Sequence, residues 1–171
     1  RVVSRATGEA YRKCGEAIES AQATRQRLEP KNVAFITEHC IRTGNRQLLD
    51  LAGQAFGRQH LIKDALVMFR WALDQDPNAI NSMISIAIVL HLDGRYAEEV
   101  PYLRRLVSLL PSDLQVLRLG IQAGAWGGDK ALMERSLELL GKHHPKLAPL
   151  ARDFIENNPT PPRRPSPRPN P

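Results

Sequence analysis

The sequence is poor in aromatic residues and has no long apolar run, and both shortages narrow the possible folds. Only 5% of its 171 residues are aromatic, whereas 42% are hydrophobic. Because sandwiches and barrels are rich in aromatic and β-branched residues, this composition favours helices packed on helices. No run alternates like a strand, and no apolar stretch approaches the roughly 18 residues of a membrane span. We therefore expect an all-α protein without a membrane span.

Cysteine is scarce too, and the two present, Cys14 and Cys40, make no disulfide framework and belong to no metal-binding motif. Both stand among helical residues, so we predict two small buried hydrophobic side chains. The five histidines do not form a ligand set at helical spacing, which predicts no metal site and no bound cofactor. No nucleophile stands in a strand–turn–helix context, so we do not expect an enzyme.

The net charge is +6, and much of it lies near the two ends of the chain. Within the middle of the chain, Lys and Arg are too scattered to form a basic stripe, and no stacking aromatic residues are interleaved with them. A nucleic-acid-binding surface needs both features. We therefore do not expect nucleic acid as a partner, and solvated helix faces are the simpler interpretation.

What the sequence does have is a period. Pro77, Pro111 and Pro145 stand 34 residues apart, and each closes a segment that reads as two short amphipathic helices. A fixed period of this length, with a proline ending each unit, is typical of helical-hairpin repeats. Because such repeats stack through their neighbours, the function is expected to lie in a surface.

The first clear repeat, residues 46–79, carries a specific residue pattern. Small residues alternate with large ones on two helix faces, and a proline follows the second helix. The matching positions are Leu49, Ala52, Gly53, Phe56, Ala65, Phe69, Ala72 and Pro77. This pattern resembles the tetratricopeptide repeat (TPR) family. The resemblance implies a right-handed α-solenoid of helix–turn–helix repeats, a TPR-like superhelix.

The period divides the chain into a leading helical hairpin, three repeats, a capping helix and a Pro/Arg-rich tail. The hairpin is either a degenerate repeat or a cap. The leading hairpin covers residues 1–45, and the three repeats cover 46–79, 80–113 and 114–147. The capping helix covers 148–157, and the tail covers 158–171. The tail contains a PxxPxR pattern at Pro159–Arg164 that SH3 domains recognise, although a linker is the simpler interpretation.

Several helix ends and departures from the repeat can be specified. We expect a first helix from Glu9 to Leu28. A last helix is expected over Lys146–Glu156, regular only after Pro149, and it would bury its apolar side chains against the third repeat. In the second repeat, Glu99 replaces a small alanine, and Pro101 either delays or kinks its helix. In the third, Gly124 replaces an aromatic residue.

A tight turn at residues 127–129 is expected between the two helices of the third repeat, with Asp129 capping the second of them.

The resemblance also implies a peptide-binding groove, lined mainly by the first helix of each repeat. The lining would consist of Gln47, Asp50, Gln54, Arg58, Asn81, Ile84, Ile88, His91, Leu92, Gln115, Arg118, Gln122 and Trp126.

The composition of that lining indicates the partner's chemistry. Family members that grip a terminal carboxylate use Lys and Asn, whereas this chain has Asp50, Ser85 and Leu119 at such positions. The apolar lining instead predicts a partner segment with aliphatic or aromatic anchors, and Arg58 and Arg118 are available for a carboxylate. Trp126 either belongs to this groove or packs against the last helix.

Three functions fit this sequence. The first is a non-catalytic adaptor or scaffold that binds an extended or helical segment of another protein. The alternatives are a secretion-type chaperone with TPR repeats, and a regulatory or targeting domain of a larger enzyme. A homo-oligomer stays open because solenoids associate through uncovered ends or grooves. The sequence does not identify the compartment, and a cytoplasmic location is favoured.

Overall fold

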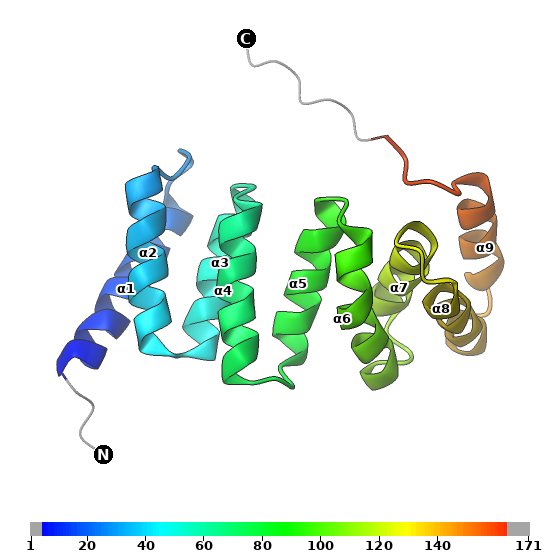
Figure 1. Cartoon of the computed structure of the whole chain (residues 1–171), viewed down its shortest axis with the longest axis horizontal. Coiled ribbons are helices and arrows are strands. Elements are labelled where there is room, and N and C mark those ends of the chain that lie inside the picture. The colour runs from blue at the N-terminus through cyan, green and yellow to red at the C-terminus, as the bar shows by residue number, and fades with distance from the viewer. Residues whose placement is uncertain (1–4, 164–171) are drawn as a thin grey trace, which may run out of the picture. The chain divides into compact units, whose positions relative to one another are not determined.

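The computed structural model describes residues 5–163, and within them it is all-helical with no strand (Figure 1). This confirms the expected all-α class. The helices are α1 (Arg5–Ala23), α2 (Pro30–Thr43), α3 (Arg46–Arg58), α4 (Ile62–Gln75), α5 (Ile80–Leu92), α6 (Tyr96–Leu109), α7 (Leu114–Trp126), α8 (Lys130–His143) and α9 (Ala148–Asn157). Part of the predicted SH3-binding pattern and the rest of the tail lie outside the described residues.

The helices form two compact units that divide within α5, between Val89 and Leu90. In the first unit, α1 packs on α2 and α3 packs on α4, while α3 also contacts α1 and α2, and α4 contacts α2. In the second unit, α7 packs on α6 and α8, α6 also contacts α8, and α9 contacts both α7 and α8. Contact with the next helix and the next but one gives each unit a repeat-like architecture.

The core of the first unit shows why its repeat pattern alternates small and large residues. Phe56 and Phe69 are buried, with exposed fractions of 0% and 2%. A Cβ atom on Gly53 would lie 2.6 Å from the Phe69 ring, so the ring occupies the space that a side chain at residue 53 would need. Ala52, which precedes Gly53, is fully buried, so small residues on α3 make room for the aromatic side chain of α4.

In the second unit, a close backbone approach explains why Gly124 replaces an aromatic residue. A Cβ atom on Gly124 would lie 2.5 Å from the Met133 backbone nitrogen and 2.8 Å from the Asp129 carbonyl oxygen. The first turn of α8 therefore occupies the space that a side chain at residue 124 would fill. The departure from the repeat is a packing feature of α7 against α8.

The turn before α8 has the predicted form. Gly128 has φ +80, a conformation that favours glycine. Asp129 is the N-cap of α8, and its Oδ1 accepts a hydrogen bond from the Leu132 backbone nitrogen at 3.0 Å. That bond is the main cause of a lowered pKa at Asp129. The capping role of Asp129 is confirmed.

Several helix boundaries differ from expectation. α1 begins at Arg5 rather than Glu9, and α9 spans Ala148–Asn157 rather than Lys146–Glu156. α1 ends at Ala23 rather than Leu28, because the following segment bonds to a side chain of α3's C-terminal end. The Gln59 amide accepts a hydrogen bond from the Leu28 backbone nitrogen at 2.7 Å and donates one to the Gln26 carbonyl at 3.3 Å. α6 begins at Tyr96, before Pro101, so the alternative of a delayed helix start is wrong.

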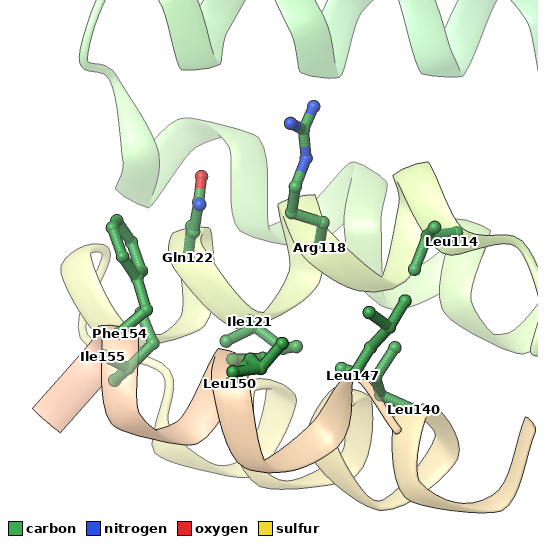
Figure 2. A pocket seen from close by; sticks show the side chains of 10 residues that line it. Leu114, Arg118, Ile121, Gln122, Leu140, Leu147, Leu150, Phe154 and Ile155 are labelled. Carbon is green, nitrogen blue, oxygen red and sulfur yellow. The ribbon is translucent and has the colours of Figure 1, made fainter. Parts of the chain in front are cut away.

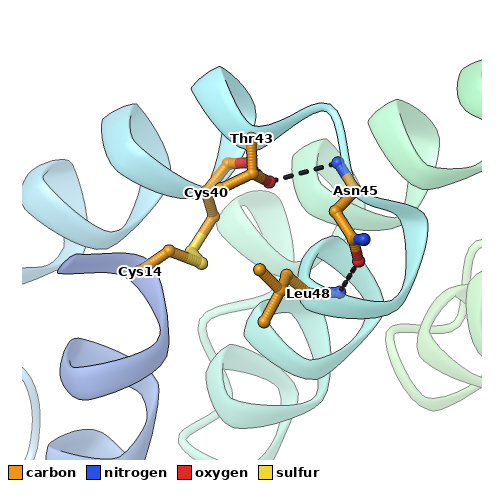
Figure 3. The surroundings of a disulfide bond; sticks show 5 residues. All are labelled: Cys14, Cys40, Thr43, Asn45 and Leu48. Atoms are coloured by element: carbon orange, nitrogen blue, oxygen red, sulfur yellow. Dashed lines mark hydrogen bonds between the residues drawn. A yellow bond between two sulfur atoms is a disulfide. The ribbon is translucent and has the colours of Figure 1, made fainter. Parts of the chain in front are cut away.

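The two cysteines are buried as predicted, but they form a disulfide rather than two separate thiols. The bond joins Cys14 of α1 to Cys40 of α2, whose Cα atoms lie 4.9 Å apart (Figure 3). Only the packing of the α1–α2 hairpin brings together two cysteines that are 26 residues apart in sequence. Near the C-terminal end of α2, the Thr43 hydroxyl donates a hydrogen bond to the Cys40 carbonyl at 2.6 Å.

Candidate functional site: an apolar groove between α7 and α9

A groove with a volume of about 330 Å³ lies between α7 and α9 in the second unit, with one residue of α8 in its lining. Its lining residues are Leu114, Arg118, Ile121, Gln122, Leu140, Leu147, Leu150, Ala151, Phe154 and Ile155. Figure 2 shows Ile121, Leu147 and Leu150 between the two helices, whereas Arg118 and Gln122 extend from α7 away from α9. The groove is therefore apolar inside, with polar side chains on its α7 side.

Local sequence positions α7 so that one face is packed and another is open. The Asp113 carboxylate begins the helix by accepting a hydrogen bond from the Val116 backbone nitrogen at 2.9 Å. Leu117 and Gly120 are buried against the rest of the unit. Leu114 and Arg118, four residues apart and therefore neighbours on one helix face, are both exposed at the groove.

The groove has a buried floor and exposed edges. Ile121 and Leu140 are each 2% exposed and Ile155 is 9% exposed, whereas Leu150 is 64% exposed and Phe154 41%. This corrects the expectation that α9 buries all its apolar residues, because only Ile155 is buried on that helix. α9 begins at Ala148, with Pro149 in its first turn, and its 10 residues cover α7 incompletely.

The electrostatics of the lining are simple. The lining contains one cation, Arg118, one amide, Gln122, and no carboxylate. Arg118 makes no hydrogen bond or ion pair with any residue in the part of the chain that the structure describes. The groove thus combines accessible apolar surface with one uncompensated positive charge, a combination that suits a macromolecular ligand with both apolar and polar groups.

Trp126 holds the far end of α9 in place. Its indole nitrogen donates a hydrogen bond to the Asn158 carbonyl at 2.9 Å, and its ring centroid lies 6.3 Å from that of Phe154. Of the two roles left open for Trp126, the contacts seen are those of packing against the last helix. Its indole therefore fixes the position of the helix that forms one wall of the groove.

Next to Trp126 lies a buried acid–imidazole pair. Glu99 is fully buried, and its two carboxylate oxygens lie 3.0 and 3.1 Å from Nδ1 of His91. Burial raises the pKa of Glu99, and the hydrogen bond from His91 opposes that rise. The His91 ring in turn lies 5.1 Å from Tyr96 and 6.2 Å from Trp126. The imidazole thus lies between the buried carboxyl group of Glu99 and the aromatic side chains that hold α9.

The predicted groove residues of the second unit are divided between two environments. Arg118 and Gln122 line the α7–α9 groove, and Gln115 is exposed on the same helix. Leu92 is 60% exposed at the end of α5. His91 and Trp126 are instead occupied by the contacts described above.

The predicted groove residues of the first unit do not line a groove together, unlike Arg118 and Gln122 in the second unit. Exposed residues are Gln47, Gln54, Arg58 and Asn81, and half-buried ones are Ile84 and Ile88.

Asp50, by contrast, is turned inward. It is 8% exposed, and its carboxylate oxygens lie 2.9 and 3.0 Å from the Ser82 hydroxyl, which donates to them. Arg46 donates a further hydrogen bond at 3.2 Å. Burial is the main cause of a raised pKa at Asp50. These contacts place Asp50 in the interior of the first unit, bonded to Ser82 of α5.

Sequence reasoning missed the contribution of α9 to the groove. The helix was expected, but its apolar side chains were assigned to the interior, and the exposed Leu147, Leu150 and Phe154 carry most of one groove wall. Pro149 gave no signal of this, because it lies in the first turn of α9 and the helix continues through it.

Among residues 5–163, no group of three or more His, Cys, Asp and Glu side chains is arranged to hold a metal ion. No helix in that range combines the length and apolar character needed to cross a membrane.

Comparison with known proteins gives no assignment. The chain matches no model of a known protein family, and no curated protein matches it in sequence.

Proposed function

We propose that this chain is a non-catalytic protein-interaction module, an adaptor or scaffold, that holds a segment of a partner protein in the groove between α7 and α9. The observation that carries the proposal is the exposure of large apolar side chains around a formed groove, above all Leu150 and Phe154. Covering such a side chain contributes on the order of 1 kcal/mol, and a pair of them in one pocket is a typical anchor for binding.

The architecture proposed with this function is a TPR-like right-handed solenoid. Its support is the 34-residue proline period, together with helix contacts to the next and the next-but-one helix inside each unit. In such an architecture α9 is the end helix, and an end helix that leaves apolar surface open provides a binding edge.

We also propose that the protein works in an oxidising compartment, in place of the cytoplasmic location favoured from sequence. The support is the disulfide between Cys14 and Cys40, because disulfides persist mainly outside reducing cell interiors. Alkylation of the protein taken from its native host, before and after reduction, tests this. Two thiols that react without prior reduction would contradict it.

The test of the binding function starts from peptides selected against the intact chain by phage display. Their affinities are then measured by fluorescence polarisation for two matched variants, Leu150→Glu in the groove and Leu109→Glu outside it. Both leucines are exposed and both belong to the second unit, at 64% and 50% exposure. We expect Leu150→Glu to weaken binding by ~10-fold or more and Leu109→Glu to leave it unchanged. Equal affinities for the two variants would overturn the proposal.

A further inference from the structure

The edges of the α7–α9 groove carry opposite charges that have no partner within the chain. Arg118 is exposed on α7, and Asp153 is exposed on α9. Neither makes a hydrogen bond or ion pair with any residue of the described range 5–163. An exposed apolar groove therefore has an uncompensated cation beside one wall and an uncompensated anion beside the other.

Helical spacing places Asp153 on the open side of α9. It stands three residues after Leu150, so the two are neighbours on one face of the helix. Ile155, the buried residue of α9, is two residues further on and points nearly the opposite way. Leu150 and Asp153 thus form one exposed edge, and Phe154, 41% exposed, follows along it.

A surface with opposite charges on the two sides of one apolar groove can match a second copy of itself across a two-fold axis. In a two-fold dimer the same patch meets itself, so each cation can meet the other copy's anion. A purely acidic ligand would oppose Asp153, and a purely basic ligand would oppose Arg118, whereas a second copy satisfies both. The exposed edge of α9 also supplies the apolar side chains that the groove would accept.

We infer that the occupant of this groove is α9 of a second copy of the chain. In the resulting two-fold dimer, Leu150 and Phe154 of each copy cover the groove of the other, and Asp153 of each pairs with Arg118 of the other. This inference rests on the proposed function, because it names the partner for the same groove. The apolar side chains supply most of the affinity, and the charges set the orientation of the two copies.

The test is the mass of the full chain in solution, measured by sedimentation velocity over a concentration series. We expect a concentration-dependent dimer, weakened by roughly 3- to 10-fold in the single charge reversals Arg118→Asp and Asp153→Arg, since each places like charges together. The double variant, Arg118→Asp with Asp153→Arg, restores opposite charges and should recover the wild-type dissociation constant. Lys63→Glu, an exposed reversal on α4 of the first unit, should change nothing.

Two results would overturn the inference. One is a monomer at every concentration, and the other is a dimer that Leu150→Glu leaves intact or that the double variant fails to restore. A monomer that binds selected peptides, with loss of binding in Leu150→Glu alone, would remove the second copy as occupant and retain the proposed function. A monomer that binds no peptide through this groove would contradict both.

Discussion

The two compact units bury similar polar groups but satisfy them differently. In the first, the buried Ser82 hydroxyl bonds to the carboxylate of Asp50, so each group supplies what the other needs. In the second, the buried carboxylate of Glu99 is paired with His91 instead. Ser136, which is also fully buried, has a hydroxyl without any hydrogen-bond partner among the described residues. The second unit therefore contains a buried polar group without a hydrogen bond, whereas the buried Ser82 and Asp50 of the first unit bond to each other.

The units differ most at the ends of the chain. The first unit is closed by a buried disulfide between α1 and α2, whereas the second ends in a short helix that leaves a groove lined by apolar side chains. A covalent link therefore fixes two helices of the first unit, whereas the second unit leaves large apolar side chains such as Leu150 and Phe154 exposed beside its last helix. Each of the following changes tests one side of that contrast.

The largest effect is expected from removing the disulfide. Replacing Cys14 and Cys40 together by alanine should lower the free energy of unfolding of the first unit by about 2–4 kcal/mol, since the unfolded chain regains the freedom of a 26-residue separation. Denaturant unfolding followed by circular dichroism measures this. If the double alanine variant unfolds like the wild type, the disulfide does not close the first unit.

A smaller loss is expected from Gly53→Ala, also in the first unit. The new Cβ atom would lie 2.6 Å from the Phe69 ring, so the ring must shift. Such overpacking lowers the free energy of unfolding by about 1–3 kcal/mol. The matched control is Gly57→Ala on the same helix, where nothing lies within 4 Å and stability should rise by about 0.4–1 kcal/mol. The two melting temperatures should move in opposite directions, and a shared direction would refute the packing assigned to Phe69.

The two buried serines should respond with opposite signs. Ser82→Ala removes a donor from the buried Asp50 carboxylate and should destabilise by about 1–2 kcal/mol. Ser136→Ala removes an unpartnered buried hydroxyl and should stabilise by about 0.5–1 kcal/mol. Urea unfolding of both variants tests the difference between the units. A destabilised Ser136→Ala variant would mean that its hydroxyl is satisfied in solution.

The smallest effect is a pH dependence from Glu99. Because burial raises its pKa in the folded state above the ordinary 4.5, the folded chain binds this proton more tightly than the unfolded chain. The contribution of Glu99 to stability is therefore greatest below pH 4.5 and falls as pH rises to the folded-state pKa. Across this pH range, the unfolding free energy of the wild type should decrease relative to that of Glu99→Gln as pH rises. A difference that is flat or grows with pH would contradict the assignment.

Much of the fold could be predicted from sequence because it depends on local patterns. The proline period placed the helix pairs, and the Gly127–Gly128–Asp129 string specified a turn and a cap. These signals are carried by residues close together in the chain, where spacing and backbone preference decide the outcome.

The candidate site was harder to predict because it depends on tertiary contacts. Nothing in the sequence near Cys14 indicates that Cys40 lies beside it, and Asp50 turned inward because Ser82 lies opposite. Arg118 was identified as a groove residue, but the opposite wall of the groove belongs to α9, whose apolar residues looked like ordinary core positions. Whether an apolar residue of α9 is exposed depends on how much of it the other helices cover. The spacing of apolar residues in the sequence does not specify this coverage.

The position of the binding surface is tested most directly by NMR spectra of isoleucine δ1-methyl groups while a selected peptide is titrated into the intact chain. Isoleucines lie in the groove, at Ile121 and Ile155, and on α5, at Ile84 and Ile88. We predict that the methyl signals of Ile121 and Ile155 shift while those of Ile84 and Ile88 stay in place. Shifts confined to Ile84 and Ile88, with the groove methyls unchanged, would contradict the account.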